Sequence, residues 1–188
     1  MGPTRVALLV ISVTSVVWLA AADPVKTTEA PASLTIAEGV PDDFEVLARG
    51  TWRRFVHAFR AHRECIAPVI VDAAWDLDDR ATYDPGRRLI TVRVPGTAPN
   101  LQASLVHELA HHLDFTCPAQ RSLRGAFLRA QGLSAGAAWW NGATWERTPS
   151  EQFAEATTEF VLERRPAHGR IFVRTEAVHT ISDWAAGK

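Results

Sequence analysis

One short stretch of the chain carries an unusual density of ionisable side chains. The segment SLVHELAHHLDF, residues 104–115, contains three histidines, a glutamate and an aspartate among apolar residues. Within it, His107, Glu108 and His111 form an H-E-x-x-H pattern. Residues four apart share one face of a helix, so both imidazoles can reach one ion while Glu108 projects beside it. Because zinc accepts imidazole nitrogen and can keep a position open for water, the pattern predicts a hydrolytic zinc site with Glu108 as the base.

The residues around this motif favour a buried helix over a solvent-exposed one. Its other positions are largely apolar, and they comprise Leu101, Leu105, Val106, Leu109, Ala110 and Leu113. Buried histidine and glutamate side chains are costly unless they have partners. The composition therefore favours a functional role for the motif.

A second segment supplies further carboxylates. SEQFAEATTEF, residues 150–160, contains Glu151, Glu155 and Glu159, spaced four apart and therefore on one helix face. Glu151 can complete a His₂Glu ligand set, and Glu155 can accept a ring N–H from a zinc-binding histidine and fix its tautomer. A solvent-facing glutamate stripe is the alternative, but the apolar neighbours in this segment favour the ligand interpretation.

Asp114 offers a different third ligand, because His107, His111 and Asp114 lie at i, i+4 and i+7 of one helix. That set lacks the turn of chain that normally brings the third ligand over the metal. We therefore favour Glu151 as the ligand. The side chain of His112 points about 100° away from that of His111, so we do not expect it to bind the metal.

The two segments HELAHHLDF and TPSEQFAEA resemble the H-E-x-x-H plus distant E-x-x-x-E arrangement of the gluzincin metallopeptidases. They are most similar to the catalytic domain of the anthrax lethal factor-type peptidases, in which an H-E-F-G-H-x-x-D helix precedes an E-F-F-A-E-A helix. The resemblance covers residues 101–162. It implies the following roles: zinc ligands His107, His111 and Glu151, the base Glu108, and supporting residues Glu155 and Asp114.

One position departs from the family pattern. The family has a tyrosine a few residues before the ligand glutamate, where it can stabilise the tetrahedral intermediate, and this chain has Trp145 in that region. Its single tyrosine is Tyr83. The candidates for a substitute are Tyr83, Arg147 and His168.

The elements that must position these residues can be predicted from periodicity. Helical spacing predicts helices within residues 41–62, 99–115, 121–133 and 148–165, whereas apolar or alternating runs predict a strand within 67–75, a hairpin over 81–96, and a short strand followed by a helix over 170–184. Strands followed by helices indicate an α+β domain, here a minimal zincin-like domain with a small mixed sheet packed on an active-site helix and a glutamate helix. We expect the strand over 89–94 to be the edge that pairs with an extended peptide.

The N-terminal residues indicate export. Arg5, an apolar run to Ala22 and small residues in an A-x-A arrangement are typical of a signal peptide over residues 1–22. An uncleaved membrane anchor is the alternative. Residues 23–40 are predicted to be a flexible linker and residues 41–188 the zinc metallopeptidase-like domain. We expect a secreted monomer without stable membrane insertion after signal cleavage.

Export favours a disulfide between Cys65 and Cys117, since these residues lack the CxxC spacing common in metal sites. A net charge of −1 gives no support for a nucleic-acid partner. We expect a secreted, zinc-dependent enzyme that hydrolyses peptide bonds in a peptide or protein substrate with zinc-activated water. The rivals are an inactive zincin-fold binding module with structural zinc and a metal-free packing of helices.

Overall fold

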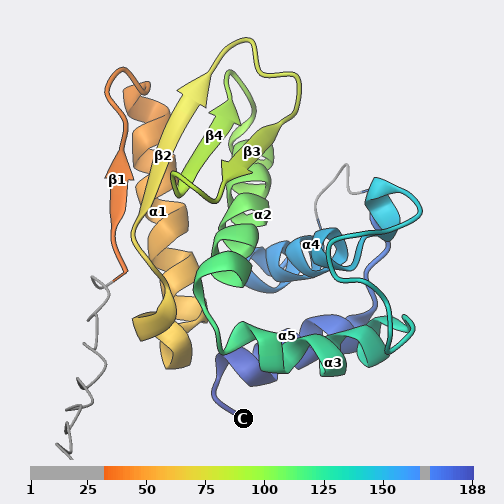
Figure 1. The fold of residues 1–188 in the computed structure, drawn as a ribbon. Coiled ribbons are helices and arrows are strands. Elements are labelled where there is room, and N and C mark those ends of the chain that lie inside the picture. Colours follow the sequence, from red (N-terminus) through yellow and green to blue (C-terminus); the bar gives the residue numbers. More distant parts are fainter. Residues whose placement is uncertain (1–31, 166–169) are drawn as a thin grey trace, which may run out of the picture.

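The computed structural model describes residues 32–165 and 170–188 (Figure 1). The predicted signal peptide lies outside these residues. In chain order the elements are β1 (Leu34–Ile36), α1 (Asp42–Ala58), η1 (Arg60–Cys65), β2 (Val69–Ala74), β3 (Ala81–Asp84), β4 (Leu89–Arg93), α2 (Ala98–Thr116), α3 (Gln120–Gln131), η2 (Trp145–Arg147), α4 (Pro149–Leu162) and α5 (Thr175–Ala185), where η marks a short 3₁₀ helix. None of the helices in the described ranges is both long and apolar enough to span a membrane.

The sheet is mixed and its strand order is β1-β2-β4-β3. β1, β2 and β4 run parallel, and β3 pairs antiparallel with β4. The predicted hairpin forms because the Asp84 carboxylate accepts hydrogen bonds from the backbone amides of Gly86 and Arg87 and so closes the turn. The α+β class with a small mixed sheet is therefore confirmed.

The predicted edge strand is wrong. β4 lies between β2 and β3, so both of its edges are already paired. β3 occupies the edge instead, because the hairpin folds it outward from β4 while β2 pairs with the other side of β4. Any extended peptide that joins this side of the sheet must therefore pair with β3.

Two further predictions are corrected by long-range pairing. The predicted linker, residues 23–40, contains β1, which pairs with β2 in the register Leu34 to Val69. No strand forms over residues 170–174. There the Gln131 side chain takes the place of a neighbouring strand, since its amide donates to the Phe172 carbonyl and its oxygen accepts from the Arg174 amide.

α2 is the central helix of the domain. It packs against β3 and β4 on one side and against α1 and α4 on others. Its apolar residues Leu105, Leu109 and Leu113 are fully buried, as the sequence predicted. Figure 1 shows α1 and α2 beside the sheet, with α3, α4 and α5 grouped together away from the strands.

The predicted disulfide between Cys65 and Cys117 is confirmed, with Cα atoms 4.8 Å apart. It joins the end of η1 to the residue that follows α2. The bridge therefore fixes the C-terminal end of the helix that carries both motif histidines.

Candidate metal centre

The two motif histidines project from one face of α2 toward α4. Their ring centroids are 5.0 Å apart, as expected for residues one helical turn apart. Pro99 lies in the first turn of α2 and Pro149 begins α4, positions where a missing backbone N–H costs no helical hydrogen bond. The facing helices bring the histidines opposite the first turn of α4.

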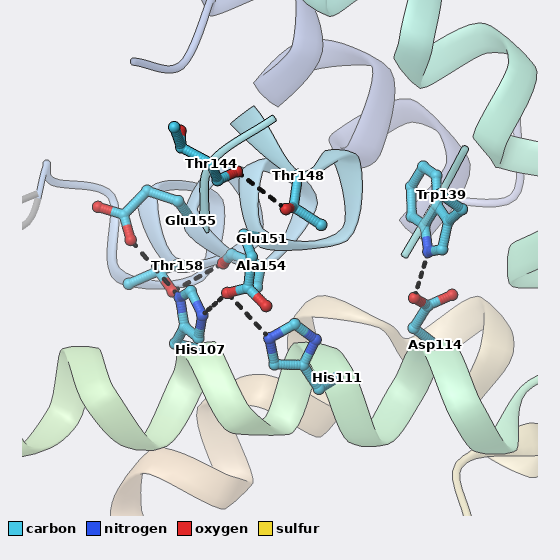
Figure 2. Close-up of polar contacts among 10 residues, drawn as sticks. All are labelled: His107, His111, Asp114, Trp139, Thr144, Thr148, Glu151, Ala154, Glu155 and Thr158. Atoms are coloured by element: carbon cyan, nitrogen blue, oxygen red, sulfur yellow. Dashed lines mark hydrogen bonds and ion pairs between the residues drawn. The ribbon is translucent and has the colours of Figure 1, made fainter. Parts of the chain in front are cut away.

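Glu151 stands between the two imidazoles (Figure 2). Its Oε2 atom lies 3.0 Å from Nε2 of His107 and 3.4 Å from Nε2 of His111. One ligand atom from each of the three side chains falls within 4.8 Å of the others, so the group could hold a metal ion. The sequence-predicted ligand set is thus brought together by two helices whose ligands lie 44 residues apart in the chain.

Glu155 lies one turn further along α4, beside His107. Its Oε2 atom is 3.6 Å from Nδ1 of His107, which orients the ring so that Nε2 faces Glu151. Burial opposes a charge on His107, but the carboxylates of Glu151 and Glu155 outweigh it and raise the pKa of His107 to about 10. Burial likewise opposes the charge on Glu151, yet the two histidines lower its pKa to about 2. Without a metal, His107 therefore holds a proton that a bound metal must displace.

Glu108 lines the same cleft next to His107 and is 9% exposed. Burial raises the pKa of its carboxyl group, and the neighbouring histidines partly oppose this shift. A carboxylate with a raised pKa accepts a proton more readily than one in water. The position and environment of Glu108 suit proton transfer.

The donor set fits a transition metal. Two imidazole nitrogens and one carboxylate oxygen are the protein ligands of many zinc sites that keep one position open. The side chains already point their ligand atoms at a common centre, and Glu155 supplies the acceptor that a metal-binding histidine requires on its other nitrogen. Nδ1 of His111 is buried and has no hydrogen-bond partner in the described part of the chain. Its ring is therefore oriented by packing and by Glu151 rather than by a second carboxylate.

Asp114 is not placed where a third ligand would be. Its side chain is fully buried, Oδ2 accepts a 2.6 Å hydrogen bond from Nε1 of Trp139, and Oδ1 accepts one of 2.7 Å from Nη2 of Arg124. Both oxygens are thus engaged away from the histidines, as Figure 2 shows for Trp139. We call the group Asp114, Arg124 and Trp139 the aspartate clamp, because it ties α2 to α3 and to the loop that follows α3.

A hydrogen-bonded chain that was not predicted from the sequence lies behind the site. His112 is fully buried, with Nε2 2.9 Å from the carbonyl of Ala67 and Nδ1 2.9 Å from the hydroxyl of Tyr83. A carbonyl can only accept, so Nε2 carries the hydrogen and Nδ1 accepts from Tyr83. Burial lowers the pKa of His112 to about 4 and raises that of Tyr83 to about 12, so both remain neutral near pH 7.

The hydrogen bond between Tyr83 and His112 limits Tyr83 as a substitute for the tyrosine of the resembled family. The hydroxyl hydrogen of Tyr83 is committed to His112, so Tyr83 can accept but not donate without breaking that bond. His168 lies outside the described residues. Arg147 lies at the end of η2, whereas the arginines that line the cleft are Arg80 and Arg170, neither of which was predicted from the sequence.

The cleft over the site has a volume of about 730 Å³. Edge strand β3 and the face of α2 that carries the motif form two of its walls, and Trp145 contributes an indole ring 6.2 Å from the His107 ring, tilted by 29°. The indole N–H of Trp145 could donate a hydrogen bond, and the Trp145 ring packs beside the His107 imidazole. The cleft is large enough for a peptide segment.

Comparisons of the chain with known protein families, with curated proteins and with solved structures find no match. The resemblance in the two motifs is therefore not supported by similarity over the rest of the chain. The assignment of a metal and of a function rests on the geometry of the site.

Proposed function

We propose that this chain is a zinc-dependent peptidase of the gluzincin type. The observation that carries the proposal is the convergence of His107, His111 and Glu151 on one point at the floor of an open cleft, with Glu108 beside them. In this arrangement the three ligands would hold zinc, which when bound supplies a Lewis acid for water and for the scissile carbonyl. Glu155 would hold the His107 ring in the orientation that binding requires.

Glu108 performs the proton transfers in this proposal. Its carboxylate takes a proton from the attacking water and later passes it to the leaving amine. The raised pKa supports this role, because proton uptake is easier for a buried carboxylate than for an exposed one. Burial also keeps the carboxylate close to the histidines rather than in bulk water.

Edge strand β3 provides the surface on which the substrate backbone would be held. The amide of Arg93 donates to the carbonyl of Arg80, so in this antiparallel register Thr82 and Asp84 face β4 with their backbone groups. The backbone N–H and C=O groups of Ala81 and Tyr83 then point outward from the sheet edge, and both residues line the cleft. An extended peptide can pair with these groups as an added strand.

A binding module with structural zinc is the second candidate. One observation favours it: the Tyr83 hydroxyl is committed to His112, and Trp145 occupies the region of the family tyrosine. Zinc would then bind His107, His111 and Glu151 without turnover. The disulfide fits an exported protein in either case, in agreement with the proposed signal peptide.

Substitution of the base tests the proposal. We expect Glu108→Gln to keep one zinc per chain and the folded state but to lose peptide hydrolysis by at least about 100-fold, the lower range for general-base catalysis. Glu176→Gln is the matched control, because Glu176 lies in the first turn of α5 and is exposed. Zinc is measured by elemental analysis and hydrolysis on a mixed peptide library. A zinc-loaded wild type without hydrolysis would leave the binding module as the function.

A further inference from the structure

Aromatic side chains gather at one end of the cleft. Phe115 and Trp140 are 48% and 42% exposed, and their ring centroids are 4.6 Å apart. The Tyr83 ring lies 5.9 Å from that of Phe115. All three side chains line the cleft that contains the metal-binding group, and we call them the aromatic wall.

On the other side of the metal-binding group the face of α2 carries small side chains, and the Trp145 ring packs beside His107. Along α2, Phe115 follows His111 by one helical turn, whereas Ala103 and Ser104 precede His107 by about one turn. The same helix face therefore presents a large apolar ring on one side of the metal-binding group and small side chains on the other. On α2 itself, the large apolar surface therefore lies only on the Phe115 side of the metal-binding group.

The aromatic wall is held in place by buried contacts. Trp139, the neighbour of Trp140, is fixed by its hydrogen bond to Asp114 in the aspartate clamp. The Arg124 guanidinium carbon lies 4.8 Å from the centre of the Trp139 ring and 5.6 Å from that of Trp140. Trp140 thus has Arg124 beside its ring and still lines the cleft with 42% of its surface exposed. A preorganised apolar surface of this kind loses little conformational entropy when a ligand binds.

The position of the aromatic wall predicts its distance from the reacting bond. The midpoint between His107 and His111 lies at the level of residue 109, and Phe115 lies six residues further on, about 9 Å along α2. An extended peptide advances about 3.3 Å per residue. The wall therefore lies about two to three residues along a bound peptide from the reacting bond.

We propose that the aromatic wall is a specificity subsite for one large apolar side chain of the substrate, two to three residues from the scissile bond. The substrate class is then peptides with an aromatic or long aliphatic residue at that position. This inference rests on the proposed peptidase function for the location of the scissile bond. The burial of apolar area against Phe115 and Trp140 supplies the preference.

Cleavage profiling of the full zinc-loaded chain tests the subsite. We expect that, at one position two to three residues from the cut, Phe, Trp or Leu is preferred over Ala by at least about tenfold in kcat/KM. Phe115→Ala and Trp140→Ala should reduce this preference to less than about threefold while zinc content stays unchanged. Trp75→Ala is the matched control, because Trp75 is 71% exposed and is not among the residues that line the cleft.

A binding measurement separates this inference from the proposed function. Fluorescence anisotropy with labelled peptides that carry Phe or Ala at the tested position is applied to zinc-loaded Glu108→Gln. We expect the Phe peptide to bind more tightly than the Ala peptide, and we expect Trp140→Ala to remove this difference. That result would support the aromatic wall even if the wild type hydrolyses nothing. Three results would overturn the assignment of the aromatic wall as a subsite. They are cleavage or binding with no preference for an apolar residue, no peptide binding at all, and an effect of Trp75→Ala as large as that of Trp140→Ala.

Discussion

Replacement of Asp114 by alanine separates the two possible ligand sets. The structure places both carboxylate oxygens of Asp114 in the aspartate clamp and leaves Glu151 between the histidines. We expect Asp114→Ala to retain one zinc per chain but to lower the free energy of unfolding. We expect Glu151→Ala to lose most of the zinc.

The size of the stability loss follows from the contacts of Asp114. Two hydrogen bonds to a charged group contribute about 1.5–3 kcal/mol each, which sets a range of about 3–6 kcal/mol. Two features favour the lower end of this range of stability loss. The Arg124 side chain is 24% exposed and can regain water, and burial raises the pKa of Asp114, so removal of the carboxylate also relieves its own desolvation. We therefore expect a loss of about 3 kcal/mol.

Urea unfolding of the zinc-loaded proteins, with elemental analysis of the same samples, measures both quantities. Trp139→Phe isolates one contact, because it keeps an aromatic ring while it removes the N–H donor that Asp114 accepts. In a double-mutant cycle, Asp114→Ala and Trp139→Phe should show a coupling energy of about 1–3 kcal/mol. Loss of zinc in Asp114→Ala with unchanged stability would refute this reasoning and restore Asp114 as the third ligand.

Four further outcomes follow from the site and the disulfide. Glu155→Ala should weaken zinc binding by about 10- to 100-fold in a chelator competition, because His107 loses the acceptor that orients its ring. Joint replacement of Cys65 and Cys117 by serine should lower the free energy of unfolding in urea by about 4 kcal/mol, the chain-entropy value for a separation of 52 residues. The pKa of His107 is about 10 without metal, so His107 must lose one proton before it can bind zinc. The apparent zinc affinity, measured by chelator competition, should therefore rise about tenfold per pH unit from pH 7 to 9. A pH-independent affinity would contradict the charge state of His107. In the metal-free chain, the pairing of His107 stabilises the fold fully below its ordinary pKa of 6.5 and is lost as the pH rises through about 10.

The ligand residues could be predicted because their arrangement is local. His107 with His111, and Glu151 with Glu155, are each one helical turn apart, and the helical period alone places each pair on one face. The cost of burying such groups without partners then suggests that the two pairs face each other. The structure brings them together as this reasoning requires.

The remaining features depend on contacts between distant segments. The partners of Asp114 lie 10 and 25 residues away in the chain, and the hydrogen bond from Tyr83 to His112 joins a strand to α2. No periodic pattern encodes such contacts. The edge strand was wrongly predicted for the same reason, because the place of β4 between β2 and β3 depends on pairing across loops rather than on its own alternating sequence.

The disulfide has a consequence for the response of the domain to mechanical force. The bridge closes the chain from Cys65 to Cys117, a loop that contains both motif histidines but not Glu151. A pulling force applied to the two ends of the chain cannot extend this loop, which withholds about 180 Å of contour length. His107 and His111 lie inside the closed loop and therefore carry none of the force, whereas α4 and Glu151 lie outside it and are pulled away. Under load, the candidate metal centre would therefore open on the Glu151 side while the two histidines remain together.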